Sequence, residues 1–102
     1  MIEVGNKEGE VSVKLRVKRL DASCADKFKQ EFLRKVTGGP GPASIDLSEV
    51  EFIDSSGVGA LLSLYKHLRK ETEDIRLLQP TPQVLSVLEL LRLHRVFTIQ
   101  TA

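Results

Sequence analysis

The chain has 102 residues, of which 41% are hydrophobic and 28% charged, and this is typical of one soluble globular domain. Its 15 basic and 14 acidic residues leave a formal net charge of +1 with no basic stripe, so we expect no nucleic-acid partner. The single Cys24 excludes an internal disulfide and gives no zinc-ligand spacing, and we expect neither a metal nor a cofactor. The sequence starts without a secretory apolar run and has no stretch long enough to cross a bilayer, which predicts a cytoplasmic location without direct membrane insertion.

The first third of the chain predicts two strands and a helix. Residues 10–17 alternate polar and apolar side chains, which is the period of a half-buried strand. Its inward side chains are those of Val11, Val13, Leu15 and Val17. Residues 2–4 indicate a shorter strand before it. Residues 23–36 have helical spacing, and Asp21 or Ser23 can cap the first turn. The apolar positions of this helix are Ala25, Phe28, Phe32 and Val36.

A turn rich in glycine and proline, residues 37–42, separates this helix from the next strand at residues 43–47. The turn lacks the Gly-Lys-Ser/Thr that would follow in a phosphate-binding loop, so a plain turn is favoured. A connection over residues 48–53 leads to a second helix that begins near Ser55 or Ser56. The buried stripe of that helix is expected to consist of Val58, Leu61, Leu62, Tyr65 and Leu68.

The last third predicts a strand, a helix and a strand. Residues 75–78 form the first strand, and Thr81 caps a helix that has Pro82 at its first position. The apolar face of this helix consists of Val84, Leu85, Leu88 and Leu91. Residues 96–99 form the closing strand. The resulting order, β-β-α-β-α-β-α-β, predicts one α/β domain over residues 1–102, with helices packed on a mixed sheet of four to five strands.

The start of the second helix holds the residues with the most chemical content. Asp54, Ser55 and Ser56 can all accept hydrogen bonds from free amides of a first turn, so capping is their plainest role. Gly57 and Gly59, however, cost helix stability, up to about 1 kcal/mol each relative to alanine. Their presence indicates that another backbone or a partner approaches this turn closely.

Residues 54–59, Asp-Ser-Ser-Gly-Val-Gly, preceded by Ile-Asp-Leu-Ser at 45–48, resemble the signature of the STAS family, which includes bacterial anti-sigma factor antagonists. Leu20-Asp21 before the first helix and the stretch 80–97 are similar to further family positions in the same order. Two departures leave the subfamily open. Lys18 stands where the family often has glycine, and the chain has no room for the carboxy-terminal helix of many members.

The resemblance implies a STAS-like fold and a phosphorylation switch. Ser55 matches the serine that an ATP-dependent serine kinase, itself the anti-sigma factor, phosphorylates in this family. A serine phosphatase is a further partner that such a cycle implies. A phosphoserine carries about −1.5 to −2 charge, so unmodified protein is expected to bind and phosphoprotein to be released. The protein would then be a kinase substrate and not an enzyme. The expected partner-binding residues are Asp21, Asp54, Ser56, Gly57, Val58 and Gly59.

Two alternatives remain open on the sequence. In a serine hydrolase, Ser55 would be the nucleophile, with His67 or His94 and Asp21 completing a triad, but Gly-x-Ser-x-Gly is absent and His67 is predicted to face solvent. In a STAS scaffold or transporter-associated subunit, a partner would bind without a phosphorylation cycle. Cys24, near a helix start, could have a lowered thiol pKa, although a small core residue is the commoner role.

Overall fold

The computed structural model describes residues 1–36 and 39–101, and in them a five-stranded mixed sheet forms the frame. In spatial order the strands are β1 (Ile2–Lys7), β2 (Glu10–Leu15), β4 (Ala43–Asp46), β6 (Ile75–Leu78) and β7 (Thr98–Gln100). β1 runs antiparallel to β2, and all other neighbours are parallel. Helices therefore serve as crossovers between the parallel strands.

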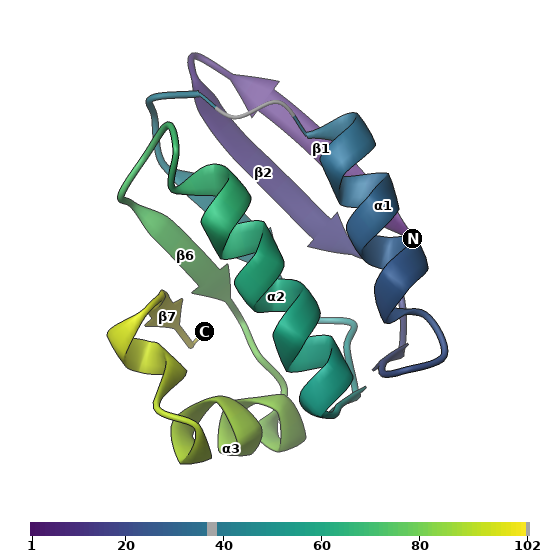
Figure 1. Ribbon diagram of the computed structural model, residues 1–102. Coiled ribbons are helices and arrows are strands. Elements are labelled where there is room, and N and C mark those ends of the chain that lie inside the picture. The colour runs from purple at the N-terminus through teal and green to yellow at the C-terminus, as the bar shows by residue number, and fades with distance from the viewer. Residues whose placement is uncertain (37–38, 102) are drawn as a thin grey trace.

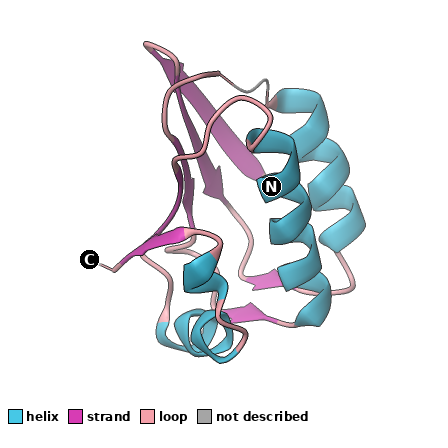
Figure 2. Ribbon diagram, turned by 60° about the vertical axis from the view of Figure 1, so that its left-hand side comes forward, coloured by secondary structure: helices cyan, strands magenta, loops and turns pink. Residues whose placement is uncertain are grey.

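Helices α1 (Ala25–Lys35) and α2 (Ser55–Leu68) lie side by side over one face of the sheet (Figure 1). Helix α3 (Pro82–Leu90) and the short 3₁₀ helix η1 (Leu93–Arg95) lie at one end of the molecule (Figure 2). The core between α1, α2 and the sheet contains fully buried Phe28, Phe32, Leu61, Leu64, Ile45 and Leu77. The predicted α/β fold, with three helices on a mixed sheet, is confirmed.

A second, two-stranded sheet consists of β3 (Arg19–Leu20) and β5 (Phe52–Ile53), and it was not predicted. The two strands are parallel, with Arg19 opposite Phe52 and Leu20 opposite Ile53. Strands of two residues are too short to show a period in the sequence. The small sheet lies at the amino-terminal end of α2 (Figure 2), and it therefore determines how that helix begins.

The cap predicted for α1 is wrong. Cys24 occupies the N-cap position, and no side chain among the described residues caps the helix. The Asp21 carboxylate instead accepts hydrogen bonds from the backbone N–H of Ser23, at 3.0 Å, and from its hydroxyl, at 2.5 Å. Asp21 thus stabilises the turn that precedes the helix, as short polar side chains often do.

Several predicted boundaries and faces also differ. β2 ends at Leu15, and the last strand begins at Thr98, after Phe97, which is buried in the core two residues beyond η1. Leu91 lies at the C-cap of α3 with half of its surface exposed, whereas Leu64, absent from the predicted stripe of α2, is fully buried. Of the predicted turn at 37–42, the first two residues lie outside the described residues.

Candidate functional site

The small sheet brings the starts of α1 and α2 together. The Lys18 carbonyl accepts hydrogen bonds from the amides of Glu51 and Phe52, at 2.7 and 3.1 Å, and the Leu20 carbonyl accepts one from the Asp54 amide at 3.4 Å. Asp21 follows β3 directly and Asp54 follows β5 directly. Because the two strands are parallel and in register, both aspartates leave the same end of the small sheet.

Asp54 is the N-cap of α2. Its backbone is extended, its carboxylate accepts the Gly57 amide at 3.0 Å, and its carbonyl accepts the Val58 amide at 2.9 Å. This cap places Ser55 and Ser56 at the first two helical positions, where both are exposed. The first amides of a helix lack intrahelical partners, and the helix dipole is positive there, so this position favours an anion.

Gly57 and Gly59 lie in the same turn of α2 but have opposite surroundings. A Cβ atom at Gly57 would lie 2.1 Å from the Leu20 carbonyl oxygen and 2.7 Å from Cγ1 of Ile53. A Cβ atom at Gly59 would have no described heavy atom within 4 Å beyond its own turn and chain neighbours. The backbone that approaches Gly57 is therefore the chain's own strand β3, and only Gly59 offers open space to a partner.

The predicted site residues thus fall into three groups by exposure. Ser55, Ser56 and Gly59 are exposed, and Asp21 and Asp54 are half-buried. The two others, Gly57 and Val58, are buried. Gly57 and Val58 can affect a partner only through the position of α2.

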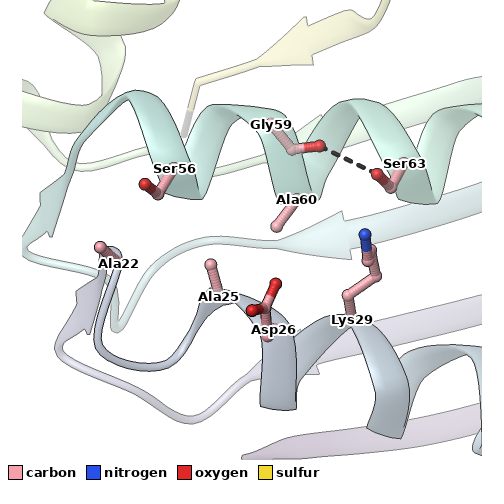
Figure 3. Close-up of a pocket in the computed structure, with 8 residues that line it drawn as sticks. All are labelled: Ala22, Ala25, Asp26, Lys29, Ser56, Gly59, Ala60 and Ser63. Atoms are coloured by element: carbon pink, nitrogen blue, oxygen red, sulfur yellow. Dashed lines mark hydrogen bonds between the residues drawn. The ribbon is translucent and has the colours of Figure 1, made fainter.

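A groove separates the amino-terminal halves of α1 and α2 (Figure 3), with a volume of about 460 Å³. Its lining residues are Ala22, Ala25, Asp26, Lys29, Ser56, Gly59, Ala60 and Ser63. Asp26 and Lys29 point from α1 toward α2, and the Ser63 hydroxyl donates to the Gly59 carbonyl at 3.1 Å (Figure 3). The groove adjoins the exposed serines, so a partner at Ser55 would also cover it.

Asp21 is held in its charged form. The hydroxyl and backbone amide of Ser23, together with Arg19 at 3.2 Å, lower the pKa of the Asp21 carboxyl below its usual value. The Arg19 guanidinium in turn lies over the Phe52 ring, 4.2 Å from its centroid. Asp21 is therefore an anion at neutral pH, and its contacts with Ser23 and Arg19 fix the orientation of its carboxylate next to the small sheet.

The start of α3 holds two residues whose contacts the sequence analysis missed. Thr81 occupies the predicted N-cap position, but its side chain makes no capping hydrogen bond, and its hydroxyl donates instead to the Val50 carbonyl at 2.6 Å. The Gln83 side chain accepts the Ile53 amide at 3.0 Å and donates to the Ile53 carbonyl at 3.4 Å. Spacing in the sequence carries no signal for contacts between residues 30 positions apart.

The structure does not assemble the hydrolase triad through His67. His67 lies twelve residues after Ser55 on α2, about 18 Å along the axis at the usual helical rise. The prediction that His67 faces solvent is wrong, because Nε2 lies 3.2 Å from the Val36 carbonyl oxygen and the ring packs edge-on against Phe32. His94 is exposed in η1, and no hydrogen bond within the described ranges joins Ser55 to either histidine.

The structure gives no special role to Cys24, and the described residues show neither a metal site nor a membrane-spanning helix. Cys24 is half-buried, and its thiol donates to the Arg19 carbonyl at 3.2 Å. Within residues 1–36 and 39–101, no group of three or more His, Cys, Asp or Glu side chains could hold a metal ion. No helix in that part of the chain has both the length and the apolar character required to span a membrane.

Comparisons with known proteins agree with this geometry. An anti-sigma factor antagonist from Mycobacterium paratuberculosis is 26% identical, with 100% of this chain and 86% of that chain covered and a TM-score of 0.84. The Bacillus cell fate determinant SpoIIAA in its phosphorylated form is 21% identical, over 99% of this chain and 92% of that chain, with a TM-score of 0.63. The murine anion transporter Slc26a9 is 24% identical, over 79% of this chain but 13% of that chain, with a TM-score of 0.68. The last two likenesses show a shared fold.

A search of curated proteins by sequence finds no match. The model of the STAS domain matches residues 6–102, nearly the whole sequence. The chain therefore belongs to the STAS domain family.

Proposed function

We propose that this protein is an anti-sigma factor antagonist whose binding to an anti-sigma factor with serine kinase activity is switched off by phosphorylation of Ser55. One observation carries the proposal. Ser55 is exposed at the first position of α2, immediately after the capping carboxylate of Asp54. The likeness to an anti-sigma factor antagonist over the full chain supports the same partner class.

The switch follows from charge. A phosphoserine at position 55 would carry about −1.5 to −2 charge and three acceptor oxygens. Within this protein that charge is tolerated, because the free amides and dipole of α2 face it. In the complex the same charge is desolvated against a surface that fitted a neutral hydroxyl, beside Asp54 and Asp21. Phosphorylation therefore weakens the complex and leaves the fold intact.

The docking surface consists of the exposed residues around Ser55 and the groove between α1 and α2. Ser56 and Gly59 line that groove directly, and Asp21 and Asp54 directly follow the two strands of the small sheet in the sequence. Gly57 supports the surface by allowing α2 to pack closely against β3, and Val58 is buried beneath it. In this role the protein is a substrate of the kinase, acts in the cytoplasm, and returns to the binding form through a serine phosphatase.

Mass analysis of protein isolated from its native host tests the proposal directly. We expect one phosphate on a fraction of the molecules, located on Ser55 by fragmentation of the peptide, and its loss on phosphatase treatment. Ser55→Ala protein from the same host serves as the control and is expected to carry no phosphate. Phosphate on Ser56 instead, or an unmodified chain under every growth condition, would contradict the proposal.

Gly59→Leu is expected to leave the fold largely intact and to weaken binding of the anti-sigma partner at least tenfold. The new side chain enters open space and fills part of the groove where a partner would sit. Thermal melting and partner affinity are measured together, with Gln30→Leu, an exposed substitution on α1 outside the groove lining, as the matched control. A well-folded Gly59→Leu protein that binds as tightly as the control would show that the interface lies elsewhere.

The likeness to part of the Slc26a9 transporter favours one second candidate, a STAS subunit that binds a partner without a phosphorylation cycle. It differs from the first proposal in its prediction for Ser55. A non-switched subunit has no phosphate at Ser55 in its host, and its partner tolerates Ser55→Asp as well as Ser55→Ala. The mass analysis and the two variants together separate the candidates.

A further inference from the structure

We infer that Gln83 is a positioning residue for Ser55, with its side-chain amide acting in place of a neighbouring strand along the outer edge of β5. The inference rests on the proposed role of Ser55 as phosphate acceptor. Gln83 belongs to the first turn of α3, 30 residues after Ile53 in the sequence, and it is not among the residues expected at the partner surface.

The hydrogen bonds of β5 show that the Gln83 side chain takes the place of a neighbouring strand. On one edge the Phe52 and Asp54 amides donate to carbonyls of residues 18 and 20, as in a parallel ladder. The N–H and C=O groups of Ile53 point to the opposite edge, because these groups alternate along a strand. There the Ile53 amide donates to Oε1 of Gln83 at 3.0 Å, and Nε2 of Gln83 donates to the Ile53 carbonyl at 3.4 Å. A primary amide offers the donor and acceptor pair that a neighbouring backbone would supply.

Thr81 provides a second anchor from the same turn of α3. Its hydroxyl donates to the Val50 carbonyl at 2.6 Å. The first turn of α3 therefore holds the segment 50–53 at both ends, and β3 holds its other side. This arrangement compensates for the shortness of β5, since two residues supply few ladder hydrogen bonds of their own.

We call the two hydrogen bonds between Gln83 and Ile53 the clamp. The position of Ile53 explains how the clamp can affect Ser55. Ile53 immediately precedes Asp54, the cap of α2, and lies two residues before Ser55. A displacement of Ile53 therefore moves the cap and the acceptor hydroxyl together. In phosphoryl transfer a misplacement of about 1 Å can lower the rate about 100-fold, because reacting groups must be aligned. Gln83 is thus expected to affect the rate of transfer more than the affinity for the kinase.

Hydrogen exchange of the Ile53 amide tests the clamp in the free protein. Gln83→Ala should speed exchange at this amide about fivefold, since the net free energy of one hydrogen bond corresponds to about that factor in the opening equilibrium. Gln83→Glu keeps the acceptor but places a carboxylate oxygen against the Ile53 carbonyl, so protection should be low at neutral pH and recover on acidification, when the introduced carboxyl can donate. Wild type and Gln83→Ala, measured in parallel, should show no such recovery. Ser86→Ala, whose hydroxyl only donates to Pro82 within α3, is the control.

Phosphorylation in a cleared lysate of the native host, supplied with ATP, tests the positioning role. We expect Gln83→Ala to lower the apparent Vmax at least fivefold at fixed lysate while the apparent KM changes less than twofold, and Ser86→Ala to match wild type. An unchanged Vmax, or a change confined to KM, would overturn the positioning role, and unaltered exchange at Ile53 would overturn the clamp. If wild type itself is not phosphorylated, the proposed function fails, and the exchange data still decide whether Gln83 holds β5.

Discussion

Ser55→Ala is expected to bind the anti-sigma partner at least as tightly as wild type, whereas Ser55→Asp should bind about 10- to 100-fold more weakly. Alanine adds no charge and little bulk at an exposed position. Aspartate brings one negative charge into an interface already next to Asp54 and the charged Asp21. In the complex the new charge loses its hydration against a surface that fits a neutral hydroxyl, which costs a few kcal/mol, and about 1.4 kcal/mol corresponds to tenfold in affinity.

The loss of binding in Ser55→Asp should occur without loss of fold. A carboxylate in the first turn of a helix is stabilising by about 0.3–1 kcal/mol, so the thermal midpoint should equal or slightly exceed that of wild type. Calorimetric affinities and melting curves of both variants, measured together, check the prediction. Full phosphorylation should weaken binding more than Ser55→Asp does, because phosphate has more charge and more acceptor oxygens. Equal binding of the two variants would exclude Ser55 as the switch.

Periodicity in the sequence predicts the main helices and strands. The alternation in β2 and the helical spacing in α1 and α2 are sufficient to predict a sheet covered by helices, whereas the errors in element boundaries come from tertiary contacts. His67 is an example of a position that a tertiary contact changes. Its place on the helix predicts that it faces solvent, but the carbonyl of Val36 after α1 is a hydrogen-bond partner for its ring nitrogen. Leu91 shows the reverse case, since α3 ends one residue earlier and leaves it half exposed.

The sequence proposes residues for the candidate site, but it does not predict the contacts that hold them in place. Asp54 and the two serines carry a helix-start pattern that the sequence shows, and the structure confirms Asp54 as the cap. The small sheet of β3 and β5 and the clamp by Gln83 join segments about 30 residues apart, and no period in the sequence reports such pairings. Gly57 was predicted in part. A glycine is unfavourable in a helix, so the sequence indicates a close neighbour at this position, but it does not identify that neighbour as β3.

Gly57→Ala and Gly59→Ala, two residues apart in one helix, are expected to have opposite effects on stability. Alanine in a helix is favoured over glycine by about 1 kcal/mol, and Gly59→Ala should gain about that much because its Cβ enters open space. At Gly57 the same Cβ would lie 2.1 Å from the Leu20 carbonyl oxygen, a backbone atom that cannot rotate away. Either α2 moves off the small sheet or the ladder between β3 and β5 breaks.

Overpacking of this kind costs about 1–3 kcal/mol, and a clash with backbone belongs at the upper end, so after the helix gain of about 1 kcal/mol we expect a net loss of about 2 kcal/mol. For a domain of this size that loss lowers the thermal midpoint by about 8 °C or more. Urea unfolding of both variants beside wild type measures the difference directly. Because Gly57 has the ordinary backbone of a helix interior, its requirement for glycine comes from packing alone. Equal stability of the two variants would mean that β3 does not press on α2, and the account of how Ser55 and its cap are held in place would fail with it.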